Sequence, residues 1–160
     1  MYSKGDTILY NPAGVCVISD IREENIIGED MEYYVLKPVF RGTSTIYVPV
    51  DNETLTSRMV SLLSKKEIEK LFEKADSSVK WVEDSKKRVM EYNEILTHNC
   101  REDVIQIIRL LKKHKEDVAK TNHKFYATDE KILNTAEKLI GEEIGFVLKM
   151  TPEEAVAALG

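Results

Sequence analysis

Hydrophobic and polar positions follow two different periods along the chain. In the first sixty or so residues, short apolar runs rich in β-branched and aromatic side chains alternate with turn signals, which predicts strands. The expected strands are Thr7–Tyr10, Val15–Ile21, Glu32–Leu36 and Thr45–Val50. Pro49 lies within the last run and indicates a strand at a sheet edge, because proline donates no ladder hydrogen bond.

Turn signals separate these strands. Asn11-Pro12-Ala13-Gly14 ends the first, residues 25–30 with Gly28 predict a hairpin loop, and Arg41-Gly42-Thr43 precedes the fourth. Several short strands at this spacing are typical of a small, strongly bent sheet or barrel. A module of about sixty residues buries a marginal core, so we expect it to pack on another element or to bind a partner.

From Ser64 onward the apolar residues recur at helical spacing. Capping-box patterns mark helix starts at Ser64 and Thr151, and Thr128 is the N-cap expected for a third start. Helices are therefore expected from Ser64, from near Trp81 to Leu96, from Arg101 to Lys120, from Thr128, and from Thr151 to Gly160. The expected buried positions are Ile68, Leu71, Phe72, Val82, Val89, Tyr92, Ile95, Leu96, Val104, Ile107, Ile108, Leu111, Val118, Ile132, Leu133, Ala136, Leu139, Ile140, Ile144, Val147 and Leu148.

The change of period predicts an α+β protein. Residues 1–62 would form a small bent β module and residues 63–160 an all-helical domain, with a linker near residues 75–80. The composition, 42% hydrophobic and 32% charged, is that of a folded, soluble protein. No apolar run is long enough to cross a bilayer and the N-terminus lacks a signal-peptide pattern, so a cytoplasmic protein is expected.

Residues with catalytic or metal-binding potential are scattered. Cys16 and Cys100 are expected to be reduced thiols, and neither they nor the three histidines have metal-ligand spacing. Glu142 and Glu143 are adjacent, so on a helix they point about a hundred degrees apart and cannot share a proton. The acidic residues of 20–24 are expected to be a solvated strand end. We therefore expect neither an enzyme nor a bound cofactor.

The net charge is −5, but residues 76–127 carry 11 Lys and Arg against 9 Asp and Glu. This positive segment contains Trp81, the single tryptophan. Trp81 is either a core anchor or an exposed apolar wedge of the kind that minor-groove binders insert between base steps. The nearby cations either solvate the surface and complement helix dipoles, or contact phosphates. The candidate phosphate contacts are Lys86, Lys87, Arg88, Arg109, Lys112 and Lys113.

Three motifs in the first half occur in a characteristic order: KGDTILYNPAGVCVISDI, GEDMEYYVLKP and YVPVDN. They resemble the N-terminal module of the CarD/CdnL transcription regulators and are similar to the polymerase-interacting domain of transcription-repair coupling factors. DVIQIIRLL and ATDEKILNTAEKLIGEEIGFVL look like the helical domain of the clostridial-type members. The matching residues of the first half are Gly5, Asp6, Tyr10, Gly14, Val15, Ile18, Ile21, Tyr33, Tyr34, Leu36, Val48, Pro49 and Asn52.

The resemblance implies a bacterial transcription regulator with a Tudor-like β module. The module would bind the RNA polymerase β subunit through an exposed strand edge, with Ile46, Tyr47, Val48 and Pro49 near the contact. The helical domain would contact promoter DNA without sequence specificity at the upstream edge of the transcription bubble. Trp81 would wedge into the minor groove there and stabilise the open complex.

The chain also departs from the family pattern. The turn after Tyr10 replaces the usual YPxHG, Tyr47 stands where an arginine is common, and residues 82–85 separate Trp81 from the basic run. Two alternatives therefore stay open: an interaction module that binds polymerase or another partner without functional DNA contact, and an enzyme of unrecognised type.

Overall fold

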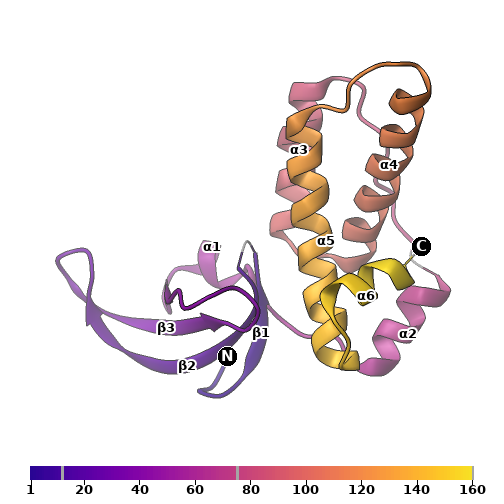
Figure 1. Cartoon of the computed structure of the whole chain (residues 1–160). Coiled ribbons are helices and arrows are strands. Elements are labelled where there is room, and N and C mark those ends of the chain that lie inside the picture. Colours follow the sequence, from indigo (N-terminus) through magenta and orange to yellow (C-terminus); the bar gives the residue numbers. More distant parts are fainter. Residues whose placement is uncertain (12, 75, 160) are drawn as a thin grey trace. The chain divides into compact units, whose positions relative to one another are not determined.

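A five-stranded antiparallel sheet forms the first part of the chain in the computed structural model (Figure 1). The structure describes residues 1–11, 13–74 and 76–159, and the chain divides into two compact units, Met1–Leu62 and Leu63–Gly160. Three predicted features include a residue outside the described ranges: the turn at residues 11–14, the linker near 75–80, and the end of the last helix at Gly160.

Strands β1 to β4 form a meander, β5 crosses over to pair with β1, and β4 and β5 are the edges of the sheet. Its order is β4-β3-β2-β1-β5. The strands are β1 (Thr7–Tyr10), β2 (Gly14–Asn25), β3 (Asp30–Pro38), β4 (Ile46–Pro49) and β5 (Met59–Ser61). All four predicted strands are confirmed, although β2 and β3 are longer than expected, and the edge position inferred from proline is confirmed for β4.

Two elements between β4 and the helices were not predicted. Helix α1 (Glu53–Thr56) begins where the Asn52 side chain accepts a hydrogen bond from the backbone N–H of Leu55, at 3.0 Å. Strand β5 follows it and pairs with β1 through Met59. Both elements are too short to show a hydrophobic period, which is why the pattern missed them.

A β-bulge shapes the sheet. The register between β2 and β3 shifts between Ile18 and Asp20, and the hydroxyl of Ser19 donates to the Val35 carbonyl at 3.2 Å. A bulge bends a strand and increases its twist, and Figure 1 shows β2 and β3 as a long curved ribbon. One core cluster of this unit consists of Ile8, Tyr10, Cys16, Ile18, Tyr34, Leu36, Val48 and Met59.

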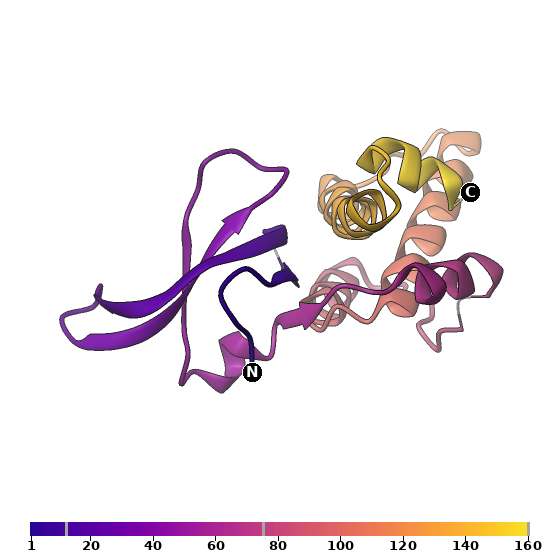
Figure 2. The same ribbon diagram turned by 90° about the horizontal axis from the view of Figure 1, so that it is seen from below.

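The second unit is all-helical, as expected. Its helices are α2 (Lys65–Glu73), α3 (Ser85–Thr97), α4 (Arg101–Lys120), α5 (Ala127–Leu148) and α6 (Pro152–Ala158). The long helices α3, α4 and α5 pack against one another, and both views show α6 folded back against α5 (Figures 1 and 2). Among the described residues, no helix is long and apolar enough to cross a membrane.

Of the five predicted helix starts, three are confirmed and two are wrong. Helix α4 begins at Arg101, as expected. The capping boxes at Ser64 and Thr151 are both formed. Helix α3 begins at Ser85, because the carboxylate of Asp84 accepts from the backbone N–H of Lys87 and so caps the helix several residues after Trp81. Helix α5 begins at Ala127, so Thr128 lies inside its first turn instead of capping it.

Most of the predicted apolar positions are buried in one core. The exception on α2 is Phe72, which is exposed. Val82 is half-buried but lies outside any helix. Five further positions are also only half-buried: Val89, Ile95, Val118, Val147 and Leu148. The buried hydrophobic residues of the core are Ile68, Leu71, Tyr92, Leu96, Val104, Ile105, Ile107, Ile108, Leu111, Ile132, Leu133, Ala136, Ile140, Ile144 and Ala155.

Two glycines allow the end of the chain to fold back on α5. A Cβ atom on Gly145 would lie 2.7 Å from the carbonyl oxygen of Met150, and one on Gly141 would lie 2.8 Å from that of Pro152. Real Cβ atoms do not approach backbone so closely, so any larger residue requires the backbone to shift.

We therefore expect Gly145→Ala to destabilise the protein although alanine is the better helix former. The free energy of unfolding should fall by about 1–3 kcal/mol in a urea titration. Asn134→Ala, at an exposed position of the same helix, is the control and should stay within about 0.5 kcal/mol of wild type. A Gly145→Ala protein as stable as wild type would contradict the importance of this close approach.

Candidate functional site

Strand β4 presents an open edge. It pairs with β3 on one side, from Tyr33 opposite Pro49 to Leu36 opposite Ile46, and no strand of the described sheet pairs with its other side. Tyr47 is 37% exposed, whereas Val48 is 0% exposed and lies in the core. Of the four predicted polymerase contacts, Tyr47 thus offers its side chain, Ile46 and Pro49 are half-buried, and Val48 can take part only through its backbone.

Tyr47 has a fixed aromatic neighbour. Its ring meets the ring of Tyr33 edge to face, with centroids 6.0 Å apart and an interplanar angle of 86°. Tyr33 is buried and stands opposite Arg22 in the register of β2 and β3. An exposed tyrosine supported by a buried one is a rigid contact residue, because it has few rotamers to lose on binding.

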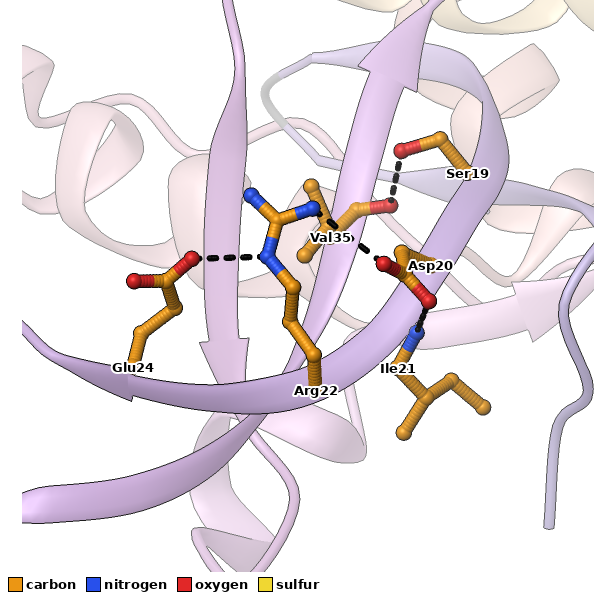
Figure 3. A network of polar contacts seen from close by, with 6 residues as sticks. All are labelled: Ser19, Asp20, Ile21, Arg22, Glu24 and Val35. Atoms are coloured by element: carbon orange, nitrogen blue, oxygen red, sulfur yellow. Dashed lines mark hydrogen bonds and ion pairs between the residues drawn. The ribbon is translucent and has the colours of Figure 1, made fainter.

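Arg22 is held between two carboxylates on β2 (Figure 3). Its Nε donates to Glu24 at 2.7 Å and its Nη1 to Asp20 at 3.2 Å. The hydrogen bond to Glu24 and then that to Asp20 raise the pKa of Arg22, and the bond from Arg22 is the main cause that lowers the pKa of Asp20. The acidic strand end is therefore an exposed ion-pair network. Among the described residues, no three His, Cys, Asp or Glu side chains lie close enough together to hold a metal ion.

Trp81 lies in an irregular segment, residues 76–84, which we call the Trp81 segment. The indole is half-buried and packs against the helical core. Its ring centroid is 4.4 Å from that of His114 on α4, and the Cζ atom of Arg88 lies 4.4 Å from the indole centroid. The tryptophan is thus neither fully in the core nor fully on the surface, and its contacts fix its position.

Arg88 is not where the sequence placed it. It is 2% exposed, and its guanidinium donates to both carboxylate oxygens of Asp129, from Nε at 2.9 Å and from Nη2 at 2.7 Å. The prediction that Arg88 contacts a phosphate is therefore wrong for this structure, because a buried guanidinium paired with a carboxylate cannot reach DNA. On α3, positions 88, 92 and 96 form the buried stripe, which turns Arg88 inward.

The other predicted phosphate contacts remain at the surface. Lys86 and Lys87 are exposed in the first turn of α3, where Lys87 pairs with Glu91 at 3.8 Å. On α4, Arg109 and Lys113 are exposed and Lys112 is half-buried.

Two hollows lie on the surface of α4, and Lys113 lines both. The first, of about 340 Å³, is lined by Trp81, Glu83, Leu110, Lys113, His114 and Asp117. The second, of about 200 Å³, is lined by Ile105, Ile108, Arg109, Lys112, Lys113, Glu116 and Leu159. The structure therefore brings Trp81 next to the basic face of α4. Lys86 and Lys87 line neither hollow.

Sequence reasoning missed the partners of Arg88. Asp129 lies in the first turn of α5 and is 0% exposed. A separation of 41 residues gives a sequence pattern no means to pair it with Arg88. Its position two residues after the start of α5 was the one available signal, because a helix N-terminus stabilises a carboxylate.

The comparisons with known proteins concern the first unit. Residues 2–60 match the family described as CarD-like/TRCF RID domain. The search of curated proteins gave no match. The match ends before α2, so the likeness to CarD-like modules concerns the N-terminal unit alone.

The two faces of β4 should respond differently to mutation. Val48→Ala should lower the free energy of unfolding by about 1–3 kcal/mol, because it leaves a cavity in the core. Tyr47→Ser should cost no more than about 1 kcal/mol, because it removes one exposed ring. Chemical denaturation of both variants measures the difference. Equal destabilisation would mean that the alternation along β4 is wrong.

Proposed function

We propose that this chain is a bacterial, cytoplasmic transcription regulator whose CarD-like module binds the RNA polymerase β subunit. The match of residues 2–60 is the observation that carries this proposal. The open edge of β4 supports a specific mode, in which a polymerase segment adds to the sheet as a further strand. Backbone hydrogen bonds would supply affinity and Tyr47 would supply specificity.

We further propose that the helical unit contacts promoter DNA and modulates the open complex. The juxtaposition of Trp81 with Lys113 supports this role, because a wedge needs cations beside it to hold the phosphates. Arg109 and Lys112 extend the basic face along α4. Lys86 and Lys87 stay as peripheral candidates.

The acidity of the chain limits the strength of the DNA contact but not its use. A net charge of −5 opposes binding to free DNA. A module docked on polymerase would hold the helical unit near the promoter at a high effective concentration, so a weak contact suffices. The proposed role requires no catalysis and no cofactor, and we propose that the protein is not an enzyme.

An interaction module without DNA contact is the second candidate. Two observations favour it: the indole of Trp81 is contacted by Arg88 and His114, and two carboxylates, Glu83 and Asp117, line the hollow beside it. Carboxylates there would repel phosphates. The effect of Trp81 variants on promoter opening separates the two candidates.

Polymerase binding should depend on Tyr47. In a titration of the full chain against a purified fragment of the cognate β subunit, Tyr47→Glu should weaken binding by roughly tenfold or more, because it places a charge at the contact. The control is Tyr126→Glu, at a tyrosine 56% exposed on the helical unit. Saturable binding that neither variant changes would place the contact elsewhere on the module. If the wild-type protein does not bind the β-subunit fragment, the proposed function is wrong.

Promoter opening should depend on Trp81. We expect Trp81→Ala to shorten the lifetime of the open complex several-fold and to leave polymerase affinity unchanged. Phe72→Ala, at an exposed aromatic residue of the same unit, is the matched control. If Trp81→Ala supports promoter opening as well as wild type does, the interaction-module candidate holds.

A further inference from the structure

One buried guanidinium connects Trp81 to helices α3 and α5 of the helical unit. Arg88 belongs to α3, pairs with Asp129 of α5, and lies 4.4 Å from the indole centroid. Its Nη1 also donates to the backbone carbonyls of Val82 at 2.7 Å and Glu83 at 3.3 Å. The side chain therefore holds both the ring of Trp81 and the backbone that immediately follows it.

The chemistry of this contact requires an arginine. Arg88 uses nitrogens on both edges of a planar fork: Nε and Nη2 for Asp129, and Nη1 for the carbonyls. The hydrogen bond to Asp129 is the main cause that raises the pKa of Arg88, so the group stays charged. A lysine offers a single point charge and cannot make the same bonds while its charge faces an aromatic ring.

Two further side chains hold the Trp81 segment on its N-terminal side. The hydroxyl of Tyr92 donates to the Lys80 carbonyl at 2.8 Å, and Nε2 of Gln106 donates to the Val79 carbonyl at 3.2 Å. Carbonyls on both sides of Trp81 thus accept bonds from α3 or α4. Side chains of two helices thus restrain a segment that has no regular secondary structure.

His114 of α4 and Phe125, which lies between α4 and α5, form an aromatic row beside the ring of Trp81. His114 lies between Trp81 and Phe125, with centroids 4.4 Å and 5.9 Å away. Lys115 lies over Phe125 at 5.5 Å and pairs with Glu130 at 3.0 Å. The indole is therefore restrained through ring contacts as well as through its backbone.

We propose that Arg88 is a positioning residue, which holds Trp81 in the one orientation in which it meets its partner. This inference rests on the proposed DNA contact, since it names what makes that contact effective. A side chain that is fixed before binding loses little conformational freedom on binding, so preorganisation raises affinity without any new contact.

The test uses Arg88→Lys in the full chain, with Trp81 as the reporter. Because the chain has one tryptophan, its fluorescence reports on this site alone. We expect greater quenching by acrylamide and lower anisotropy of the indole in the variant. We also expect roughly tenfold weaker binding to a duplex with a melted upstream edge, as loss of a preset orientation predicts.

Arg101→Lys is the matched control. Arg101 makes the equivalent bidentate pair with Glu143, at 2.8 Å and 2.6 Å, in the same unit. Its partner Glu143 belongs to α5 and not to the Trp81 segment, so replacing Arg101 should lower stability and leave indole quenching and DNA affinity unchanged. If Arg88→Lys fails to fold, Tyr92→Phe removes a single bond to the segment and should shift the same readouts in the same direction.

The readouts separate this inference from the proposed function. Indole mobility that changes equally in Arg88→Lys and Arg101→Lys would overturn the positioning role, regardless of the measured DNA affinities. A more mobile indole in Arg88→Lys with unchanged DNA affinity would also overturn the positioning role. If Trp81→Ala likewise leaves DNA affinity unchanged, the proposed DNA contact is wrong as well. A selective gain in mobility together with a selective loss of affinity supports both.

Discussion

The buried pair of Arg88 and Asp129 sets the geometry of the helical unit around Trp81. Removing two charges from water costs several kcal/mol each, and their attraction offsets this only when the remaining donors are also satisfied. Here a bidentate bond, two backbone carbonyls and the first turn of α5 meet that condition. All of these bonds are met together in this arrangement of α3, α5 and the Trp81 segment, and removing either partner would leave a buried charge uncompensated.

A second ion pair, in which the carboxylate is buried and the arginine is half-buried, has a similar role elsewhere in the same unit. Glu143 of α5 accepts from Arg101 of α4 and, at 2.9 Å, from the backbone N–H of Leu63 before α2. Each pair joins a long helix to a stretch of chain that has no helical bonds of its own. Apolar contacts between helices tolerate sliding and exchange of similar side chains, whereas directional bonds to named carbonyls and N–H groups do not. The helices thus supply the core, and the two ion pairs hold the non-helical segments that connect the helices.

Sequence patterns predicted the parts of this protein whose physics is local. The strand runs, the edge proline at Pro49 and both capping boxes depend on neighbours within a few residues, and all are confirmed. The predicted start of α3 is wrong because Trp81 and Val82 look like the beginning of an apolar stripe. The capping carboxylate of Asp84 instead decides where the helix begins. The prediction that Arg88 contacts a phosphate is wrong because Arg88 follows two lysines. The sequence of a basic run shows its charge but does not show which of its residues points into the core. Only tertiary structure tells a buried arginine from a solvated one.

The two interpretations of Trp81, core anchor and external contact, are compatible in this structure. The ring packs on the helical core, touches Arg88 and His114, and still lines an open hollow beside Lys113. A mobile, fully exposed indole would lose conformational freedom on entering a DNA groove, and a fully buried indole could not enter the groove. A half-buried ring held by charged and aromatic neighbours avoids both problems. The packing contacts that argue for a structural residue are therefore the same contacts that would make Trp81 an effective wedge.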